Sequence, residues 1–502
     1  MGLADTPLTT RGIAVRLFIT CWVIFAMHFA TNSVRELFPA MSVGERLSVD
    51  VSEYAGMHPD LFEMERRGWF INNNPGASFV GAVPYAAAAP VVNWAADRVK
   101  ARRAATGAEA PVFDSPWPLA REFHRKAFAR GLDIKLGLGA AVTQAFGMAV
   151  VSALAVVVMF HVLRVRIGSD RTAAWLAVLY AMATPMLYRT AQLNQNLMVA
   201  HCALVGFVLL WRPWDAGGAA RRPRYLLAGL LCGYAVVCDY SGLVVVLVLG
   251  IYAVIRWAGS ARELRRWVDL PLFGVGLVVC ALVLMGYQWV CFGHPIKPAQ
   301  FYMPPPEHGY PGMGWPEFEL MWRTMFDPRY GLFVAAPLLG LMFVGMFWPR
   351  GDRRLMPRRE GWVCVAFAAA MLLFCSANSF GYIQYNSGVR HVVPAAPFVF
   401  LLAAGVLAHM PRGAAIAIGV VCTGWTWCGA MVRDVEMGRG ILEGPLAVVT
   451  GGPRLPWLTT LERMGYVSGG IWATVVIVVV AAFVGVLWRV RFGGKAEAVA
   501  AA

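Results

Sequence analysis

Apolar segments of nearly membrane-spanning length recur along almost the whole chain, and they restrict the fold more than any motif does. A helix needs about 20 mostly apolar residues to cross roughly 30 Å of hydrocarbon. The pattern predicts an all-α polytopic membrane protein with about 12 transmembrane helices, within a range of about 11 to 13. The predicted spans are 13–31, 138–163, 172–188, 197–211, 225–238, 240–256, 270–291, 331–348, 361–377, 392–409, 413–431 and 469–488.

Composition agrees with this class of protein. Hydrophobic residues make up 58% of the 502 residues and charged residues only 15%, far from the values of soluble domains. The ten cysteines lie within or at the ends of the predicted spans, and none forms a CxxC pair, so we expect small packing residues rather than metal ligands or disulfides.

Lys and Arg concentrate in alternate connections between the spans, which predicts the orientation because positive charge is retained on the cytoplasmic side. We therefore expect both termini in the cytoplasm. The net charge of +15 reflects this topology, and no nucleic-acid partner is predicted. The first span is too long for a cleaved signal peptide and is expected to be an anchor. The predicted inner basic groups lie at 11–16, 164–171, 212–224, 256–266, 350–359, 412 and 489–495.

The segment 77–96 is apolar and nearly long enough to span, but a crossing there would reverse the side of every later arginine group. Pro84 and Pro90 also weaken it as an isolated span. We therefore expect an interfacial helix on the outer leaflet. The first outer loop then covers 32–137 and contains juxtamembrane helices, within a catalytic module of residues 1–410. Residues 411–502, with an outer loop at 432–468, form a C-terminal module.

The long first loop holds the candidate catalytic carboxylates. Arg35-Glu36 follows the first span closely, where a carboxylate could be a general base for a lipid-delivered group, or part of an ordinary interfacial ion pair. Asp50 and Asp60, with Arg66 and Arg67 nearby, could form an acid/base or metal-binding pocket, or equally the solvated face of a loop.

Amides and further polar residues complete the candidate site. Asn72-Asn73-Asn74-Pro75-Gly76 offers donors and acceptors to a sugar or phosphate before a tight turn, although a purely structural turn is the alternative. Polar clusters also fall at the outer ends of later spans, where they could converge on the same volume. They contain Asn194, Gln195, Asn196, His201, Asp239, Tyr330, Tyr385, Arg390 and His391.

These residues resemble the GT-C superfamily of polytopic glycosyltransferases, which contains protein mannosyltransferases and aminoarabinose transferases. Arg35-Glu36 takes the place of the family's acidic residue after the first span, although Ser33-Val34-Arg35-Glu36 replaces its common Asp-Glu. Asn73-Asn74-Pro75-Gly76 resembles its Lys-Pro-Pro or Lys-x-Pro-Gly turn, with Asn in place of Lys. The stretches 327–337 and 388–394 are similar to its Tyr/His-Gly-Leu and Gly-x-Arg-Tyr patterns.

The resemblance implies transfer of a sugar from a polyprenyl-phosphate donor to a glycan, lipid or protein acceptor on the outer face of a bacterial inner membrane, with inversion. The base is one of Glu36, Asp50 and Asp60, with Glu36 as the first choice and Asp50 as the second. Donor phosphate would be bound by residues among Arg35, Arg66, Arg67, Asn73, Asn74, Arg390 and His391. Asp239, Tyr330 and Tyr385 would line the substrate pocket.

No cofactor and no metal site are predicted, and membrane lipids are the surrounding partners. Two other classes stay open: a transporter or flippase of a lipid-linked envelope precursor, and a non-catalytic scaffold in envelope assembly. A transporter would be expected to place its polar residues near the middle of the membrane, and here they fall mostly at the ends of the spans.

Overall fold

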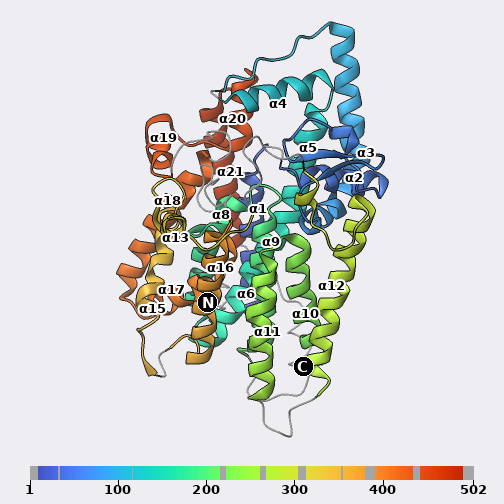
Figure 1. Cartoon of the computed structure of the whole chain (residues 1–502). Coiled ribbons are helices and arrows are strands. Elements are labelled where there is room, and N and C mark those ends of the chain that lie inside the picture. Colours follow the sequence, from blue (N-terminus) through green and yellow to red (C-terminus); the bar gives the residue numbers. More distant parts are fainter. Residues whose placement is uncertain are drawn as a thin grey trace, which may run out of the picture.

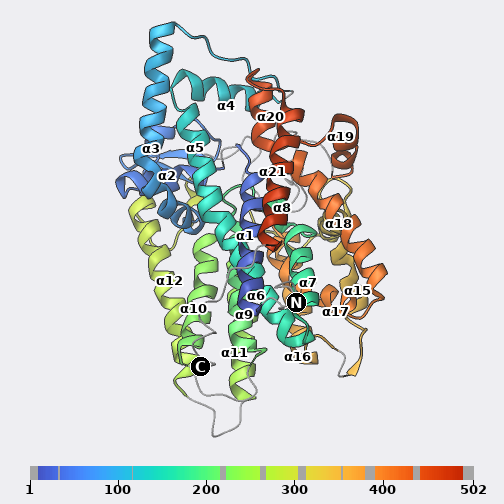
Figure 2. The ribbon, with the colours of Figure 1, turned by 180° about the vertical axis from the view of Figure 1, so that it is seen from behind.

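The protein is a bundle of apolar helices with a helical region projecting from one end (Figures 1 and 2). The computed structural model describes residues 9–31, 34–115, 117–214, 222–259, 267–303, 312–351, 354–378, 390–432 and 441–489. The bundle is built from α1 Thr10–Met27, α6 Ala149–Ile167, α7 Asp170–Met182, α9 Gln195–Trp211, α10 Arg222–Cys238, α11 Gly242–Ala258, α12 Asp269–Phe292, α16 Arg358–Ser376, α17 Ala396–Leu407, α18 Arg412–Val432 and α21 Gly469–Arg489.

Shorter elements and the projecting region complete the described chain. One antiparallel hairpin pairs β1 Leu61–Met64 with β2 Gly68–Ile71. The remaining α-helices are α2 Leu37–Arg46, α3 Gly76–Thr106, α4 Pro118–Ala129, α5 Asp133–Thr143, α8 Met186–Arg189, α13 Phe318–Phe326, α14 Leu332–Ala335, α15 Met342–Gly345, α19 Glu443–Gly451 and α20 Pro456–Arg463. A π-helical turn, η2 Gln144–Met148, joins α5 to α6.

The prediction of an all-α polytopic membrane protein is confirmed. Ten of the twelve predicted spans coincide with one apolar helix each, and four of these helices are shorter than 18 residues. The other two spans are interrupted. The predicted span 331–348 divides into α14, η5 Pro337–Leu341 and α15, because Pro337 has no N–H to continue the α-helical ladder. Likewise, α7 ends before Pro185, and the short helix α8 follows.

Hydrogen bonds between helix ends and loops show which ends of the helices lie together. The Thr10 hydroxyl at the start of α1 donates to Asp170 at the start of α7 over 2.8 Å. Arg166, at the end of α6, donates to the carbonyl of Leu355 over 2.8 Å. The chain therefore returns to its starting end of the bundle after α6, so the segment between α1 and α6 adds no further traverse of the bundle.

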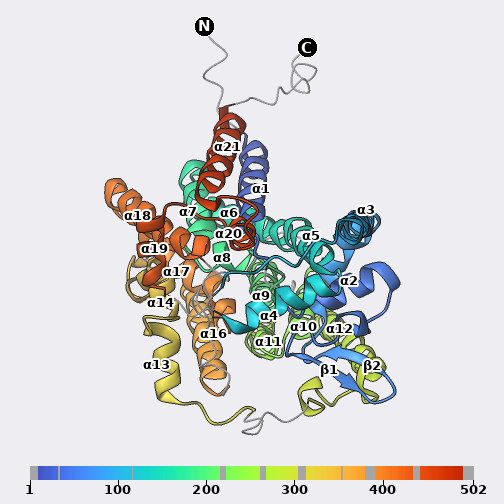
Figure 3. The same ribbon diagram turned by 90° about the horizontal axis from the view of Figure 1, so that it is seen from above.

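The prediction that 77–96 lies flat on a membrane surface is wrong. Residues 76–106 form one continuous helix, α3, which runs through Pro84 and Pro90. Figures 1 and 2 show α3 upright at the end of the bundle, above α12 and pointing away from it, and Figure 3 shows it end-on. Its length and composition would suit a span. Its first turn, however, already packs at the end of α10, where a Cβ on Gly76 would lie 2.6 Å from the Cys238 sulfur.

Packing explains the upright position of α3. Its inner face, which includes Tyr85 and Val92, packs against α2 and α5 in a small apolar core. Near the far end, Arg103 forms a bidentate ion pair with Asp133 at 2.9 and 2.8 Å. The upright position of α3 is therefore held by its packing on α2 and on the antiparallel helix α5.

The C-terminal helices pack on the N-terminal ones. Trp427 of α18 donates to the imidazole of His28 over 2.6 Å, and Trp457 of α20 donates to the carbonyl of Met27 over 3.1 Å. Arg16 of α1 donates to the carbonyl of Leu487 over 3.1 Å. The predicted division of the chain at residue 410 stays a prediction. All ten cysteines are free thiols, and nine of them are buried.

We expect the helical region that projects from the bundle to lose stability in mild acid. The titrating group is His124, which lies in α4 of this region. Its ring packs 4.0 Å from the ring centroid of Phe113, and burial lowers its pKa from 6.5 to about 4. The unfolded chain therefore takes up a proton first as the pH falls below 6.5, and stability is lost between pH 6.5 and about 4. The cost between pH 7.5 and pH 5 is about 2 kcal/mol.

Thermal unfolding of the purified protein in detergent at these two pH values measures the effect. His124→Phe keeps the aromatic packing and should reduce the pH-dependent shift in the unfolding midpoint. An identical shift in the variant would show that His124 is not responsible.

Candidate functional site

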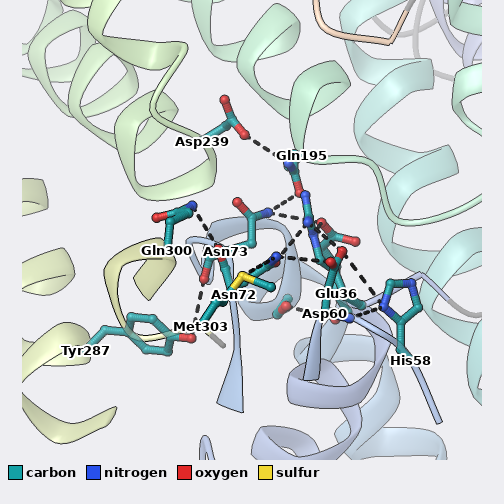
Figure 4. A network of polar contacts seen from close by, with 12 residues as sticks. Glu36, His58, Asp60, Asn72, Asn73, Gln195, Asp239, Tyr287, Gln300 and Met303 are labelled. Carbon is teal, nitrogen blue, oxygen red and sulfur yellow. Dashed lines mark hydrogen bonds and ion pairs between the residues drawn. The ribbon is translucent and has the colours of Figure 1, made fainter. Parts of the chain in front are cut away.

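The candidate site is a cluster of charged and amide side chains at the end of the bundle from which α3 projects (Figure 4). We call it the Arg35 cluster. Hydrogen bonds and ion pairs connect its members in one chain of contacts. Its residues are Arg35, Glu36, Asp60, Asn72, Asn73, Gln195 and Asp239.

Arg35 joins the two carboxylates of the first loop. Its Nε donates to Glu36 Oε1 over 3.1 Å, and its terminal nitrogen donates to Asp60 Oδ2 over 2.7 Å. The same nitrogen donates to Asn72 Oδ1 over 2.9 Å. A planar guanidinium can make these contacts at once because its donors point in fixed directions.

The β-hairpin brings Asp60 and Asn72 together. In its register Leu61 lies opposite Ile71, so Asp60 and Asn72 are the next pair beyond the strands. The backbone N–H of Asn72 donates to the carbonyl of Asp60 over 3.1 Å, and its side-chain amide donates to Asp60 Oδ1 over 3.0 Å. Both carboxylate oxygens of Asp60 are therefore occupied.

Electrostatics hold Asp60 ionised. Burial alone would raise its pKa, but the positive charges around it, with that of Arg35 foremost, hold the pKa below 3.8. His58 accepts a hydrogen bond from the Asp60 N–H over 3.0 Å, and burial lowers the pKa of His58 below 6.5. A carboxylate with a lowered pKa is a weak base, so Asp60 suits charge balance better than proton abstraction.

Glu36 lies directly before α2 and is only 3% exposed. The Ser78 hydroxyl fixes its backbone by donating to its carbonyl over 2.8 Å. Both side-chain hydrogen bonds, from Arg35 and from Asn73, end on Oε1. Among the residues that the structure describes, none donates to Oε2, which is not fully enclosed. Glu36 therefore keeps one oxygen available for an incoming group.

The asparagine turn contacts the protein rather than an open surface. Asn73 donates to Glu36 Oε1 over 3.1 Å and also to the side-chain carbonyl of Gln195. Asn74 donates to the carbonyl of Val236 near the end of α10 over 2.7 Å. The first amide thus orients the Glu36 carboxylate, and the second fixes the turn to the bundle.

Two later helices complete the cluster. Gln195, the first residue of α9, donates to Asp239 Oδ2 over 2.9 Å. Asp239 follows α10, and its other oxygen accepts the N–H of Ser241 over 2.8 Å. The sequence placed Asn194, Gln195 and Asn196 among several converging groups, but only the tertiary contacts select Gln195.

Arg390 and His391 lie near the cluster, just before α17. The charges of Arg35, Glu36, Asp60 and Asp239 all act on Arg390, whose pKa burial lowers from 12.5. Burial, followed by the charges of Arg390, Arg35 and Arg189, lowers the pKa of His391 to about 3. His391 is therefore a neutral imidazole near three guanidinium groups, and the carboxylates of the Arg35 cluster act on the same region. Sequence reasoning did not single out Arg189.

The structure does not bring the other predicted residues to the cluster. Asp50 Oδ1 accepts the N–H groups of Ser52 and Trp69, each over 3.0 Å, and so supports the hairpin. Arg66 is exposed in the hairpin turn with a positive φ of 62°. Arg67 donates to the carbonyls of Trp289 and Val290 at the end of α12, where a cation is favourable.

Tyr330 is buried in the main apolar core, and no contact joins it to the cluster among the described residues. Tyr385 lies outside the described residues. Within the described ranges, no group of three or more His, Cys, Asp or Glu side chains could hold a metal ion.

Comparisons with known proteins give few matches. No family model and no curated protein matches the sequence. Two solved structures are similar: crystal structures of ArnT from Cupriavidus metallidurans, one bound to undecaprenyl phosphate and one in the apo state. The first is 15% identical and covers 91% of this chain and 76% of that chain, with a TM-score of 0.46. The second is 17% identical and covers 92% and 77%, with the same TM-score of 0.46.

The double contact of Arg35 gives a direct test of the cluster. We expect Arg35→Gln to destabilise the fold by about 3 kcal/mol, because it removes the ion-pair partner of the buried Glu36 and of the half-buried Asp60. Asp60→Asn should cost less after Arg35 is already changed, with a coupling of about 1 to 3 kcal/mol. Unfolding of the two single variants and the double variant measures this coupling. Arg102→Gln, which changes an exposed arginine on α3, is the charge-matched control. Additive effects of Arg35→Gln and Asp60→Asn on the free energy of unfolding would contradict the expectation.

Proposed function

We propose that this protein is a membrane glycosyltransferase of the GT-C type that uses a polyprenyl-phosphate-linked sugar. The observation that carries the proposal is the Glu36 carboxylate, buried at a bundle end with one occupied and one available oxygen. The motif resemblance supports the same assignment, because Glu36 takes the position of the family's acidic residue.

Glu36 is the base in this proposal. Its Oε2 takes the proton of an acceptor hydroxyl as the hydroxyl oxygen attacks the anomeric carbon of the donor sugar. The new glycosidic C–O bond forms as the C–O bond to the phosphate breaks, so the configuration inverts and polyprenyl phosphate leaves. Asp60 and Asp239 are weaker candidates because each has both carboxylate oxygens occupied by hydrogen bonds.

Arg390 is the proposed phosphate ligand. Arg35 already contacts two carboxylates. The charges of Arg35, Glu36, Asp60 and Asp239 all act on Arg390, which places this second guanidinium beside the cluster. A bidentate guanidinium suits a phosphate that gains charge as it leaves. Asn73 takes no part in phosphate binding here, because its amide is occupied by Glu36 and Gln195.

We propose that this end of the bundle faces the outside of a bacterial inner membrane. The opposite end carries the arginines of the short connections, including Arg164, Arg166, Arg256 and Arg359, where positive charge is retained in the cytoplasm. A lipid-linked donor would then keep its tail beside the helices and its phosphate near Arg390. The acceptor is a hydroxyl of a glycan, lipid or protein.

Sugar transfer by the purified protein in proteoliposomes tests the base assignment. With polyprenyl-phosphate sugars as donors, Glu36→Gln should lower kcat by about a hundred-fold or more, because it removes a general base while keeping shape. Asp50→Asn is the matched control and should keep kcat near wild type, although it weakens the hairpin. Equal loss in both variants would reject Glu36 as the base. Donor movement across the bilayer without transfer by the wild type would favour a flippase.

The donor site has a separate test. Arg390→Lys keeps the charge but loses the bidentate fork, so kcat/KM for the donor should fall about ten-fold, and Arg390→Gln should lower it further. Arg67→Gln is the control. It removes an arginine of the β-hairpin that contacts the end of α12, and it should leave kcat/KM nearly unchanged. Unchanged kcat/KM in both Arg390 variants would remove Arg390 from the phosphate site.

A further inference from the structure

A second site lies at the opposite end of the bundle from the Arg35 cluster. α17 runs from the region of His391 toward this end, and its residue Gly405 lines a cavity of about 370 Å³. We call this cavity the arginine pocket. Its lining includes three arginines and an apolar wall, with Arg350, Arg354, Arg358, Phe347, Trp362 and Leu401 among the residues.

The arginines of the pocket differ from their neighbours in how their charge is balanced. Arg359 donates to the buried Glu360 carboxylate over 3.0 Å, and Arg256 lies 3.7 Å from the same carboxylate. Within the part of the chain that the structure describes, no carboxylate pairs with Arg350, Arg354 or Arg358. Among the described residues, the Nε atom of Arg354 is buried and has no hydrogen-bond partner. The described part of the pocket therefore presents three cations without a paired carboxylate, and one unused donor.

The same pocket borders the apolar perimeter of the bundle. Phe347 is 67% exposed and Trp362 is 66% exposed, and both line the cavity. In a protein that spans a membrane, such exposed aromatic side chains near helix ends meet lipid at the interface with water. A molecule bound here would contact the arginines on one side and the hydrocarbon of the membrane on the other. An anionic amphiphile has both the negative charge and the apolar part that these surroundings require.

The walls of the pocket are fixed by the fold. Arg166 of α6 donates to the carbonyl of Leu355 over 2.8 Å and so fixes the loop before α16. On the other side α15 and α17 are in close contact, since a Cβ on Gly345 would lie 2.3 Å from the carbonyl oxygen of Leu402. A water takes about 30 Å³ of liquid volume, so the cavity has room for a glycerol phosphate group rather than only a bare phosphate.

We propose that the arginine pocket binds the headgroup of an anionic phospholipid. The phosphate would contact Arg350, Arg354 and Arg358, and the acyl chains would lie outward along Phe347 and Trp362. Basic pockets between membrane helices on the cytoplasmic side bind such headgroups through charge and hydrogen bonds. The proposal does not depend on sugar transfer, because it uses residues at the other end of the bundle.

Lipid titration of the purified full chain tests the pocket. Phosphatidylglycerol should bind saturably by native mass spectrometry and raise the thermal unfolding midpoint, whereas phosphatidylcholine should do neither. Arg354→Gln and Arg358→Gln should each weaken phosphatidylglycerol binding by about five-fold. Arg171→Gln, an exposed arginine at the same end of the bundle, is the charge-matched control and should bind as wild type.

A second variant separates the pocket from a general effect of charge. Gly361 lines the cavity and has no atom closer than 4.0 Å to an added Cβ, so Gly361→Leu fills the pocket while keeping every arginine. It should lose phosphatidylglycerol binding yet unfold at a midpoint no lower than lipid-free wild type. Wild-type binding by Gly361→Leu would overturn the proposal. Inorganic phosphate or glycerol 3-phosphate binding as tightly as the lipid would also overturn it, in favour of a soluble anion.

Discussion

The geometry of the candidate site depends on one largely buried guanidinium, that of Arg35. Arg35 lies between the carboxylates of Glu36 and Asp60, and its contact with Asn72 ties the end of the first span to the β-hairpin. Without that cation, two carboxylates would face each other in a poorly hydrated space, at a cost of several kcal/mol. The positions of Glu36, of the hairpin and of the asparagine turn all follow from satisfying this charge.

The carboxylates of the Arg35 cluster differ in how many of their oxygens accept hydrogen bonds. Asp60 and Asp239 accept hydrogen bonds on both oxygens, so each fixes its neighbours in place. Glu36 accepts on one oxygen only. The carboxylates that sequence reasoning left as candidate site residues therefore differ in what they can do, and the difference comes from partners far away in the chain.

The two ends of the bundle differ in how far their positive charges are paired with carboxylates. At the Arg35 cluster, cations and carboxylates alternate and the charge is nearly balanced. At the arginine pocket, three arginines lie beside exposed aromatic side chains, and the carboxylate of Glu360, next to the pocket in the sequence, is paired with Arg359 and Arg256. Balanced charge suits a site that positions and transfers a proton, and unbalanced charge suits a site that retains an anion.

The amino-acid sequence was sufficient to predict the class of fold, most helix positions and the location of Arg35-Glu36 shortly after the first span. Span length and arginine distribution are local properties, set by the thickness of the bilayer and the cost of moving charge across it. The tertiary contacts were needed to show that Arg35 links Asp60 rather than Asp50 to Glu36, that Gln195 links the asparagine turn to Asp239, and that α3 stands upright. Those outcomes depend on strand register and helix packing between distant segments, where residues of the same type are distinguished only by their partners.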